Sequence, residues 1–224
     1  MSDSPSLRQS LRELRVFSGE LPRFDTDAAP AAPLTLLVDW LEYAIESGVA
    51  QPHAASLATV SVDGVPSNRT LLLKDVDDSA VWFASLSSGP KGADLATNPV
   101  AALTLYWREQ GRQVRIVGRV EAGPRERSEA DFLQRHPNAR AVAIAGDQSE
   151  RMSPADATPR LEAARARIAD EPDYVPDEWV AYRLQPTSVE FWQAERERDQ
   201  VRLRYVLGAG SGTGPVWTQE RLWP

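Results

Sequence analysis

Residues 190–205 join an aromatic strand to a cluster of arginines, in the order Glu190-Phe191-Trp192-Gln193-Ala194-Glu195-Arg196-Glu197-Arg198-Asp199-Gln200-Val201-Arg202-Leu203-Arg204-Tyr205. The apolar runs at Val189–Trp192 and Val201–Leu207 predict two strands. The arginine side chains offer rigid forks for phosphate or carboxylate, and Trp192 offers a flat face for an aromatic ring. The plainer interpretation is a solvated hairpin in which Glu and Arg balance each other. Other segments of the chain have to decide between the two.

The composition is that of an ordinary globular protein with room for one substantial core. Of the 224 residues, 42% are hydrophobic and 25% are charged, and this length allows one or two domains. No apolar run approaches the length of a membrane span, and the N-terminus lacks the apolar core of a signal peptide. We therefore expect a cytoplasmic protein with no membrane partner.

Several kinds of chemistry are disfavoured by residues that the chain lacks. Because Cys is 0, no disulfide, thiolate metal site or cysteine nucleophile can form. The His count of 2, His53 and His136, argues against a zinc site or a histidine-based triad. The net charge of −7 argues against nucleic acid as the main partner. We expect no metal, and chemistry that relies on Arg, Lys, Gln, Ser and aromatic groups or on a bound cofactor.

The first part of the chain is expected to hold two helices joined by a linker. Leu7, Leu11 and Leu14 predict a short amphipathic helix that ends near Gly19. Residues 22–33 contain three prolines among alanines and acids, which is typical of a linker. Apolar spacings of three and four then predict a helix over 34–45, with Gly48 as its stop. We treat 1–33 as a mobile N-terminal segment and linker, and 34–224 as one domain.

From residue 54 the hydrophobic period changes to two, which predicts β-strands. Asp63-Gly64 predicts one hairpin turn, and the run Glu109-Gln110-Gly111 predicts another. A short helix is expected at Lys91–Thr97, ended by Asn98-Pro99. The expected strands are Ala55–Val62, Val65–Lys74, Val81–Leu86, Val100–Trp107, Arg112–Glu121, Trp179–Leu184, Ser188–Gln193 and Val201–Leu207, with Val216-Trp217 and Leu222-Trp223 closing the chain.

Residues 125–171 are expected to be helical and to interrupt the strands. The segments Ser128–Arg135 and Ala139–Gln148 predict two helices, and Thr158-Pro159 is expected to cap a third. Many antiparallel strands with helices between them predict an α+β fold, an antiparallel β-barrel with inserted and flanking helices.

Four short clusters could carry chemistry, although each alone is compatible with an ordinary surface segment. Asn68–Lys74 places a cation at either end of an apolar strand. Ser87–Gly92 is a loop of small residues that opens a helix with a lysine, which suits a phosphate but does not match a Walker pattern. Gly111–Arg115 puts an amide on a polar strand face, and Asp147-Gln148-Ser149 is expected to end a helix with hydrogen-bonding groups.

The order of these clusters is more specific than any one of them. The chain carries Arg69-x-x-x-x-Lys74, Ser88-x-x-Lys91-Gly92, Asn98-Pro99, Arg112-Gln113-Val114-Arg115, Gln148-Ser149, Glu190-Phe191-Trp192-Gln193 and Leu222-x-Pro224. From about Leu34 to Pro224 this order resembles the pyridoxamine 5′-phosphate oxidase family. The resemblance implies a split-barrel homodimer that binds flavin mononucleotide (FMN) across the subunit interface. It implies a small phosphorylated substrate, pyridoxine or pyridoxamine 5′-phosphate, which is oxidised to pyridoxal 5′-phosphate with oxygen as acceptor.

The resemblance also implies roles for individual residues. The implied catalytic residues are Arg198 and Lys74. FMN would be contacted by Arg69, Leu72, Lys74, Ser85, Lys91, Gln113, Gln148, Ser149, Trp192 and Arg202. The substrate would be contacted by Lys74, Asp131, Arg135, Ala139, Arg198 and Gln200. These roles make chemical sense, because Arg69 and Lys91 can neutralise a phosphate dianion and a cation such as Arg202 can stabilise a reduced, anionic flavin.

The chain departs from the family pattern at several of these positions. Pro90-Lys91 stands where the family usually has an Arg-Lys pair, and Ala84 replaces a tyrosine. At the substrate positions, Asp131, Ala139 and Gln200 replace tyrosine, serine and histidine. The Asp131 carboxylate would repel a substrate phosphate unless Arg135 or Arg198 pairs with it first. We therefore expect a retained flavin site and a remodelled substrate site.

Three functions remain open from the sequence. The first is oxidation of the vitamin B6 phosphate, since Lys74, Arg135 and Arg198 are present. The second is an FMN-dependent biosynthetic oxidase acting on another small ring compound, as in phenazine-pathway relatives that share a run like Leu105–Glu109. The third is a flavin or pyridoxal phosphate binding protein without turnover.

Overall fold

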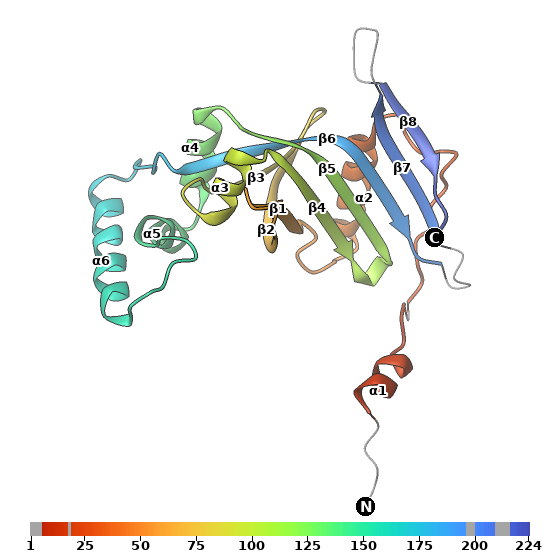
Figure 1. The fold of residues 1–224 in the computed structure, drawn as a ribbon, viewed down its shortest axis with the longest axis horizontal. Coiled ribbons are helices and arrows are strands. Elements are labelled where there is room, and N and C mark those ends of the chain that lie inside the picture. The colour runs from red at the N-terminus through yellow and green to blue at the C-terminus, as the bar shows by residue number, and fades with distance from the viewer. Residues whose placement is uncertain (1–5, 18, 196–199, 209–215) are drawn as a thin grey trace, which may run out of the picture.

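A computed structural model describes residues 6–17, 19–195, 200–208 and 216–224 (Figure 1). Within these ranges the helices are α1 (Leu7–Glu13), α2 (Pro33–Glu46), α3 (Pro90–Thr97), α4 (Arg125–Gln134), α5 (Pro137–Ala145) and α6 (Pro154–Asp170), with a 3-10 turn at Arg108–Gln110. The strands are β1 (Ala54–Val60), β2 (Pro66–Val76), β3 (Val81–Leu86), β4 (Val100–Trp107), β5 (Arg112–Ala122), β6 (Trp179–Gln193), β7 (Val201–Gly208) and β8 (Val216–Arg221).

The strands form a sheet that closes on itself through its longest member. Their order is β3-β2-β1-β4-β5-β6-β7-β8, and all neighbours are antiparallel. The first half of β6 also pairs with β3, so β1 to β6 close into a barrel. The second half of β6 carries β7 and β8 beyond the barrel (Figure 1). This architecture confirms the predicted α+β antiparallel barrel.

Alternation along the strands separates a dry interior from a polar outer face. On β5, Val114 and Ile116 are fully buried, whereas Gln113 and Arg115, which alternate with them, are not. Strand β6 buries Phe191 on the same inner side, and Trp40 of α2 packs edge-on against its ring at 5.1 Å between centroids. Burying each such apolar side chain contributes roughly 1.5–3 kcal/mol. The outer face is therefore free to hold polar groups.

Strand β6 is one continuous element, and the predicted division into Trp179–Leu184 and Ser188–Gln193 is wrong. Pro186 cannot donate a hydrogen bond to a sheet, which is why the sequence favours a break there. The strand continues because its register with β5 shifts between Val117 and Gly118, opposite Pro186. A Cβ on Gly118 would lie 2.0 Å from the Gln185 carbonyl oxygen, so only glycine allows this approach.

Two helix boundaries in the inserted region also differ from the prediction. Helix α6 begins at Pro154 after the N-cap Ser153, so Thr158-Pro159 lies inside the helix and does not cap it. Proline suits the first helical position, and Pro154 takes that position one turn earlier. Helix α5 ends at Ala145, which leaves Gln148 in the following turn.

No helix among the described residues is long and apolar enough to cross a membrane.

Candidate functional site

Two cations, Arg69 on β2 and Lys91 in the first turn of α3, line one cavity of about 470 Å³. The cavity also receives Ser85 of β3 and Gln148 from the turn after α5. The structure therefore brings together four of the residues predicted to contact FMN. In the part of the chain that the structure describes, neither Arg69 nor Lys91 forms an ion pair with a carboxylate.

The two cations are poorly solvated, and this changes their acidity. Lys91 is only 7% exposed. Its burial, and to a smaller extent the positive charge of Arg69, lowers the pKa of Lys91 to about 8. Burial also lowers the pKa of Arg69, with the nearby Asp94 acting in the opposite direction. Neighbouring cations that are partly desolvated, and that form no direct ion pair among the described residues, are suited to bind an anion such as a phosphate.

Arg69 is held in place by strand β1 and by its own strand. Its guanidinium donates to the Leu57 carbonyl at 3.1 Å, to Thr59 Oγ1 at 2.8 Å and to Ser67 Oγ at 2.5 Å. Thr59 in turn donates to Asp94 Oδ2 on α3 at 2.6 Å. Asp94 therefore orients Arg69 through the Thr59 hydroxyl without contacting it directly.

The loop before α3 folds tightly enough to bring Lys91 into the cavity. Lys91 Nζ donates a hydrogen bond to Gln148 Oε1. A Cβ on Gly89 would lie 2.5 Å from that same Gln148 oxygen, and a Cβ on Gly92 would lie 2.1 Å from the Ser87 carbonyl oxygen. Glycine is thus needed at position 92, where the loop approaches its own backbone, whereas a side chain at position 89 would displace the end of the Gln148 side chain.

A second cavity of about 400 Å³ contains the predicted substrate residues Lys74, Asp131 and Arg135. It adjoins the first cavity, because Arg135 lines both. Lys74 and Arg69 both lie on β2, but Lys74 lines the second cavity and Arg69 the first. Strand β2 shifts its register with β3 between Leu73 and Asp75, directly beside Lys74.

The Asp131 carboxylate is already paired. One oxygen lies 3.2 Å from Lys74 Nζ, and the other accepts a hydrogen bond from Trp179 Nε1 at 3.0 Å. Of the two arginines considered as its partner, Arg135 forms no ion pair with Asp131 in the described part of the chain, and Arg198 lies outside that part. The contact to Lys74 forms because α4 packs against β6, which brings its side chains within reach of β2, an arrangement that no local pattern encodes.

Arg135 is the cation of this second cavity that keeps an unused donor. Its guanidinium lies 4.3 Å from the Trp179 ring centroid and donates to the Ala139 carbonyl at 3.2 Å. Its Nε is buried and has no hydrogen-bond partner among the residues that the structure describes. Burial lowers the pKa of Arg135, and the charge of Asp131 opposes this shift.

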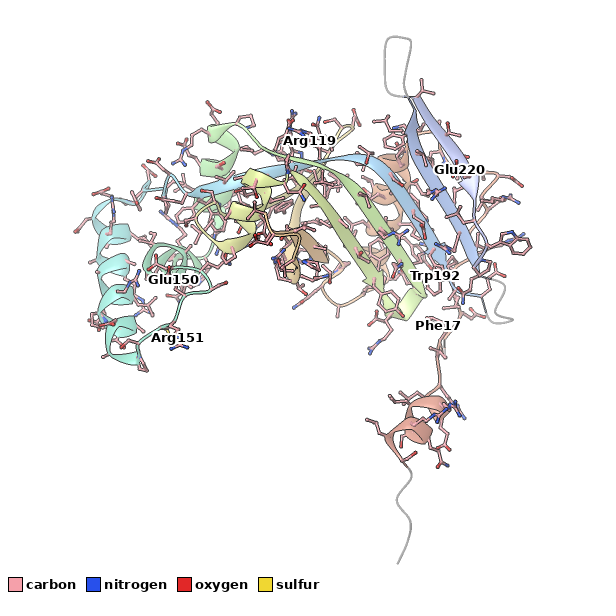
Figure 2. All side chains as sticks on the ribbon, in the orientation of Figure 1. Phe17, Arg119, Glu150, Arg151, Trp192 and Glu220 are labelled. Carbon is pink, nitrogen blue, oxygen red and sulfur yellow. The ribbon has the colours of Figure 1, made fainter. Side chains whose placement is uncertain are left out.

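A third group of predicted residues meets on the outer face at the far end of β6. Gln113, Trp192 and Arg202 are register partners on β5, β6 and β7, and Trp192 Nε1 donates to Gln200 Oε1 at 2.8 Å. All four line one cavity of about 360 Å³. Figure 2 shows Trp192 close to Phe17 at this end of the molecule, and their ring centroids are 6.1 Å apart.

The first and third cavities lie at opposite ends of β6. Ser85 pairs with Val180 near the start of β6, whereas Trp192 lies near its end. The extended strand between them spans about 40 Å. Within one protomer these two groups of residues are too far apart to contact the same small molecule.

Two predicted FMN contacts are not placed in these cavities. Leu72 is 43% exposed on β2 and lines neither cavity near Arg69, and Ser149 is exposed in the turn after α5. Their roles, and that of Arg198, remain predictions.

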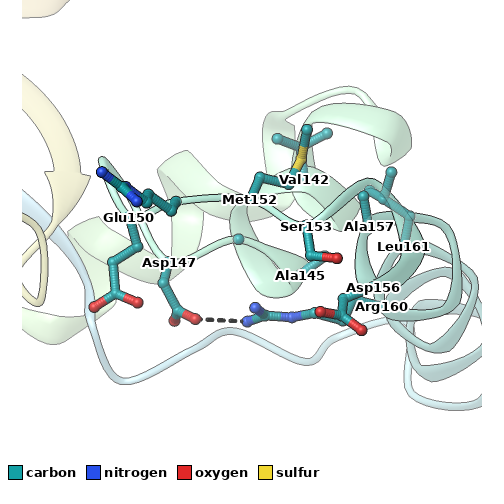
Figure 3. A pocket seen from close by; sticks show the side chains of 12 residues that line it. Val142, Ala145, Asp147, Glu150, Met152, Ser153, Asp156, Ala157, Arg160 and Leu161 are labelled. Carbon is teal, nitrogen blue, oxygen red and sulfur yellow. Dashed lines mark hydrogen bonds and ion pairs between the residues drawn. The ribbon is translucent and has the colours of Figure 1, made fainter.

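One further cavity, of about 360 Å³, lies between α5, α6 and the segment that joins them (Figure 3). Its wall includes an ion pair between Arg160 and Asp147 at 2.8 Å, beside the apolar Val142 and Leu161. None of the residues predicted to contact FMN or substrate lines it.

Sequence reasoning missed several residues of the site. Thr59 and Asp94 support Arg69, Trp179 holds Asp131, and Glu190 contacts Arg202. Glu190 belongs to the Glu-Phe-Trp-Gln motif, which was the one available signal for it. The other contacts join strands and helices far apart in sequence and leave no local pattern.

The donors around the first cavity fit one terminal phosphate, as FMN carries. The cations Arg69, Lys91 and Arg135, a buried serine hydroxyl and an amide line it, and its one carboxylate, Asp147, is paired with Arg160. Among the described residues, no cluster of three or more His, Asp or Glu side chains could hold a metal ion.

Comparison with known sequences shows the family. The family model described as "Pyridoxamine 5′-phosphate oxidase" matches residues 41–170, and that described as "Pyridoxine 5′-phosphate oxidase C-terminal dimerisation region" matches residues 179–224. A pyridoxine/pyridoxamine 5′-phosphate oxidase of Bordetella petrii is 39% identical over 88% of this chain and 92% of its own. One of Burkholderia cenocepacia is 38% identical over 96% of this chain and 99% of its own.

Comparison with solved structures supports the same family. PhzG of Burkholderia lata, in complex with tetrahydrophenazine-1-carboxylic acid, is 31% identical, covers 92% of this chain and 100% of its own, and superposes with a TM-score of 0.82. An FMN-binding protein of Nostoc punctiforme shares the fold at 19% identity, over 86% of this chain and 98% of its own, with a TM-score of 0.69. The relatives in sequence are named as oxidases, which supports an oxidoreductase. By both its sequence and its barrel, the chain belongs to the pyridoxamine 5′-phosphate oxidase family.

Proposed function

We propose that this protein is an FMN-dependent oxidase of small ring compounds, with pyridoxine or pyridoxamine 5′-phosphate as the first candidate substrate. The single observation that carries the proposal is the pair Arg69 and Lys91, two cations that lose solvent in one cavity and that have no carboxylate paired to them among the described residues. FMN would supply the redox chemistry when bound there, accepting electrons from the substrate and passing them to oxygen.

The residues of the first cavity would bind the FMN phosphate. Arg69, fixed by Thr59 and Ser67, would donate charge-assisted hydrogen bonds in a set direction. Lys91 would contribute a compact charge, and the Ser85 hydroxyl a short hydrogen bond. The backbone around Gly89 and Gly92 keeps Lys91 in place for this role.

We propose that the complete site forms between two copies of the chain. The residues expected at the ring of the flavin, Gln113, Trp192 and Arg202, lie at the opposite end of β6 from Arg69. A two-fold dimer would bring this end of one protomer to the phosphate end of its partner. The match of residues 179–224 to a dimerisation region supports the same arrangement.

The substrate would lie in the second cavity, beside Lys74, Asp131 and Arg135. Arg135 retains a buried, unpartnered Nε and would donate to an acidic group of the substrate. Relatives 38–39% identical over most of the chain are named for pyridoxine and pyridoxamine 5′-phosphate, which supports these substrates.

A second candidate is oxidation of a ring compound that carries a carboxylate in place of a phosphate. The ion pair between Lys74 and Asp131 favours it, because Lys74 is then no longer free to neutralise a phosphate dianion. The similar PhzG structure contains tetrahydrophenazine-1-carboxylic acid, a ring compound with one carboxylate.

Oxygen uptake by the FMN-loaded protein separates these functions. We expect turnover with pyridoxine 5′-phosphate, pyridoxamine 5′-phosphate or a partly reduced ring carboxylate, and the ratio of their specificity constants identifies the substrate class. FMN binding without oxygen uptake on any of the three would contradict oxidase function and leave a binding protein.

A further inference from the structure

A buried carboxylate connects two arginines on the outer face where the third cavity lies. Glu190 of β6 is only 5% exposed. Its Oε2 lies 2.6 Å from Arg115 Nη2 on β5, and its Oε1 accepts from Arg202 Nε at 3.1 Å and Nη2 at 2.6 Å on β7. The three side chains, which we call the Glu190 triad, line the same cavity as Trp192.

The triad fixes the direction of Arg202. Two nitrogens of its guanidinium point to Glu190, and Nη1 donates to the Trp223 carbonyl at 2.9 Å. A fork held at three nitrogens keeps one orientation and loses little further entropy when a ligand arrives. Arg202 is 26% exposed and still lines the cavity.

The triad also fixes a local charge. Two arginines and one carboxylate leave a formal charge of one positive unit, in a partly buried setting where solvent screens it weakly. The Glu190 carboxylate interacts with both arginines, so the positive charge of Arg115 offsets part of the negative charge that would otherwise offset Arg202. The charge that the cavity presents is therefore set by three residues and not by Arg202 alone.

We infer that Glu190 is a positioning residue that sets the charge presented by Arg202 to the flavin ring and thereby tunes the reduction of the flavin. The inference rests on the proposed function, in which FMN lies beside Arg202. Reduction of FMN takes up two electrons and one proton and leaves the ring with one more negative charge. A more positive triad would favour that reduced form, and a less positive triad would disfavour it.

Two substitutions change the formal charge of the triad in opposite directions without replacing Arg202 itself. Glu190→Gln raises the formal charge to two positive units, and Arg115→Gln lowers it to zero. We expect the ratio of affinities for reduced and oxidised FMN to rise roughly tenfold in the first variant and to fall in the second. The midpoint potential of the bound flavin, measured against a reference dye, should accordingly become more positive in one and more negative in the other.

Glu121→Gln is a matched control. Glu121 pairs with Arg183 at 2.8 Å between β5 and β6, on the same sheet, but it lies six residues from Arg115 along β5 and lines none of the cavities described above. The control should leave the potential unchanged even if it lowers the thermal unfolding midpoint. Because Arg115 is about half exposed, Arg115→Gln should fold even if Glu190→Gln does not.

The outcomes separate this inference from the proposed function. Wild-type protein that fails to bind FMN would overturn the proposed function itself. Wild-type protein that binds FMN, with Glu190→Gln, Arg115→Gln and Glu121→Gln all at the wild-type potential, would overturn the role of Glu190. Shifts of the flavin potential with the same sign in Glu190→Gln and Arg115→Gln would overturn it as well. A charge effect has to move the potential in opposite directions in these two variants, whereas a structural defect does not.

Discussion

Replacing Asp131 with asparagine tests whether the second cavity discriminates against phosphate. In the wild type, the Asp131 carboxylate lies 3.2 Å from Lys74 Nζ and holds that cation. A phosphate bound to Lys74 would lie about 5 Å from the carboxylate, and two unit charges at that distance repel by roughly 3 kcal/mol at an effective dielectric of about 20. This corresponds to about a hundredfold in the specificity constant.

Solvent reduces this effect, since 35% of the Lys74 side chain is exposed. We therefore expect Asp131→Asn to raise kcat/KM for pyridoxine 5′-phosphate by roughly ten- to a hundredfold. The assay is oxygen uptake at fixed FMN saturation, with kcat/KM converted to a difference in transition-state stabilisation. The asparagine oxygen can still accept from Trp179 Nε1, so the fold of α4 against β6 should persist.

Asp75→Asn is the control for this prediction. Asp75 lines the same cavity, but it is paired with Arg127 and not with Lys74, and 53% of its side chain is exposed. Solvent therefore screens its charge, and its removal should change kcat/KM by less than about threefold. If Asp131→Asn leaves kcat/KM for pyridoxine 5′-phosphate unchanged at equal FMN content, Asp131 does not repel the substrate phosphate, and the second cavity is not selective in the way proposed.

Three further predictions concern the cofactor, the dimer and the barrel. The pKa of Lys91 is about 8 in the free protein, and a bound phosphate dianion favours its protonated form. FMN affinity, measured by fluorescence titration, should therefore be highest below pH 8 and fall about tenfold per pH unit above it. Lys91→Arg should flatten this pH profile. Arg69→Ala and Arg202→Ala should each abolish activity when expressed alone. When they are co-expressed, half of the dimers are mixed and each mixed dimer keeps one intact site, so about a quarter of the wild-type sites should recover. No recovery would place each site within one protomer. Gly118→Ala should cost about 3 kcal/mol and lower the unfolding midpoint by roughly 10 °C, whereas Gly208→Ala, whose Cβ would meet only an ordinary contact at 3.4 Å, should not.

The strands of the barrel were predictable because their period-two pattern is local. Strands β3 and β4 have the predicted bounds, and β5 extends one residue further than expected. The error at β6 has a specific cause: Pro186 is a strand breaker unless its neighbour strand carries a bulge, and the bulge depends on Gly118, 68 positions away in the chain. A pairing between distant residues leaves no trace in either local window.

Which residues share a cavity was more predictable from the sequence than their ion pairs and pKa values. Arg69, Ser85, Lys91 and Gln148 share a cavity as the resemblance implies. The partner of Asp131 was not predictable, because both Lys74 and Arg135 are cations within reach and only the packing of α4 selects Lys74. The depressed pKa of Lys91 likewise depends on how deeply the loop buries it, which composition does not encode.

Titration of the flavin-free protein with FMN and with riboflavin tests the central claim most directly. Riboflavin has the same ring but no phosphate, so it cannot use Arg69 or Lys91. Two charge-assisted hydrogen bonds contribute roughly 1.5–3 kcal/mol each, so FMN should bind one equivalent per protomer, at least about a hundredfold more tightly than riboflavin. Equal affinities, or no binding of FMN at micromolar concentration, would contradict a flavin phosphate site at these two cations.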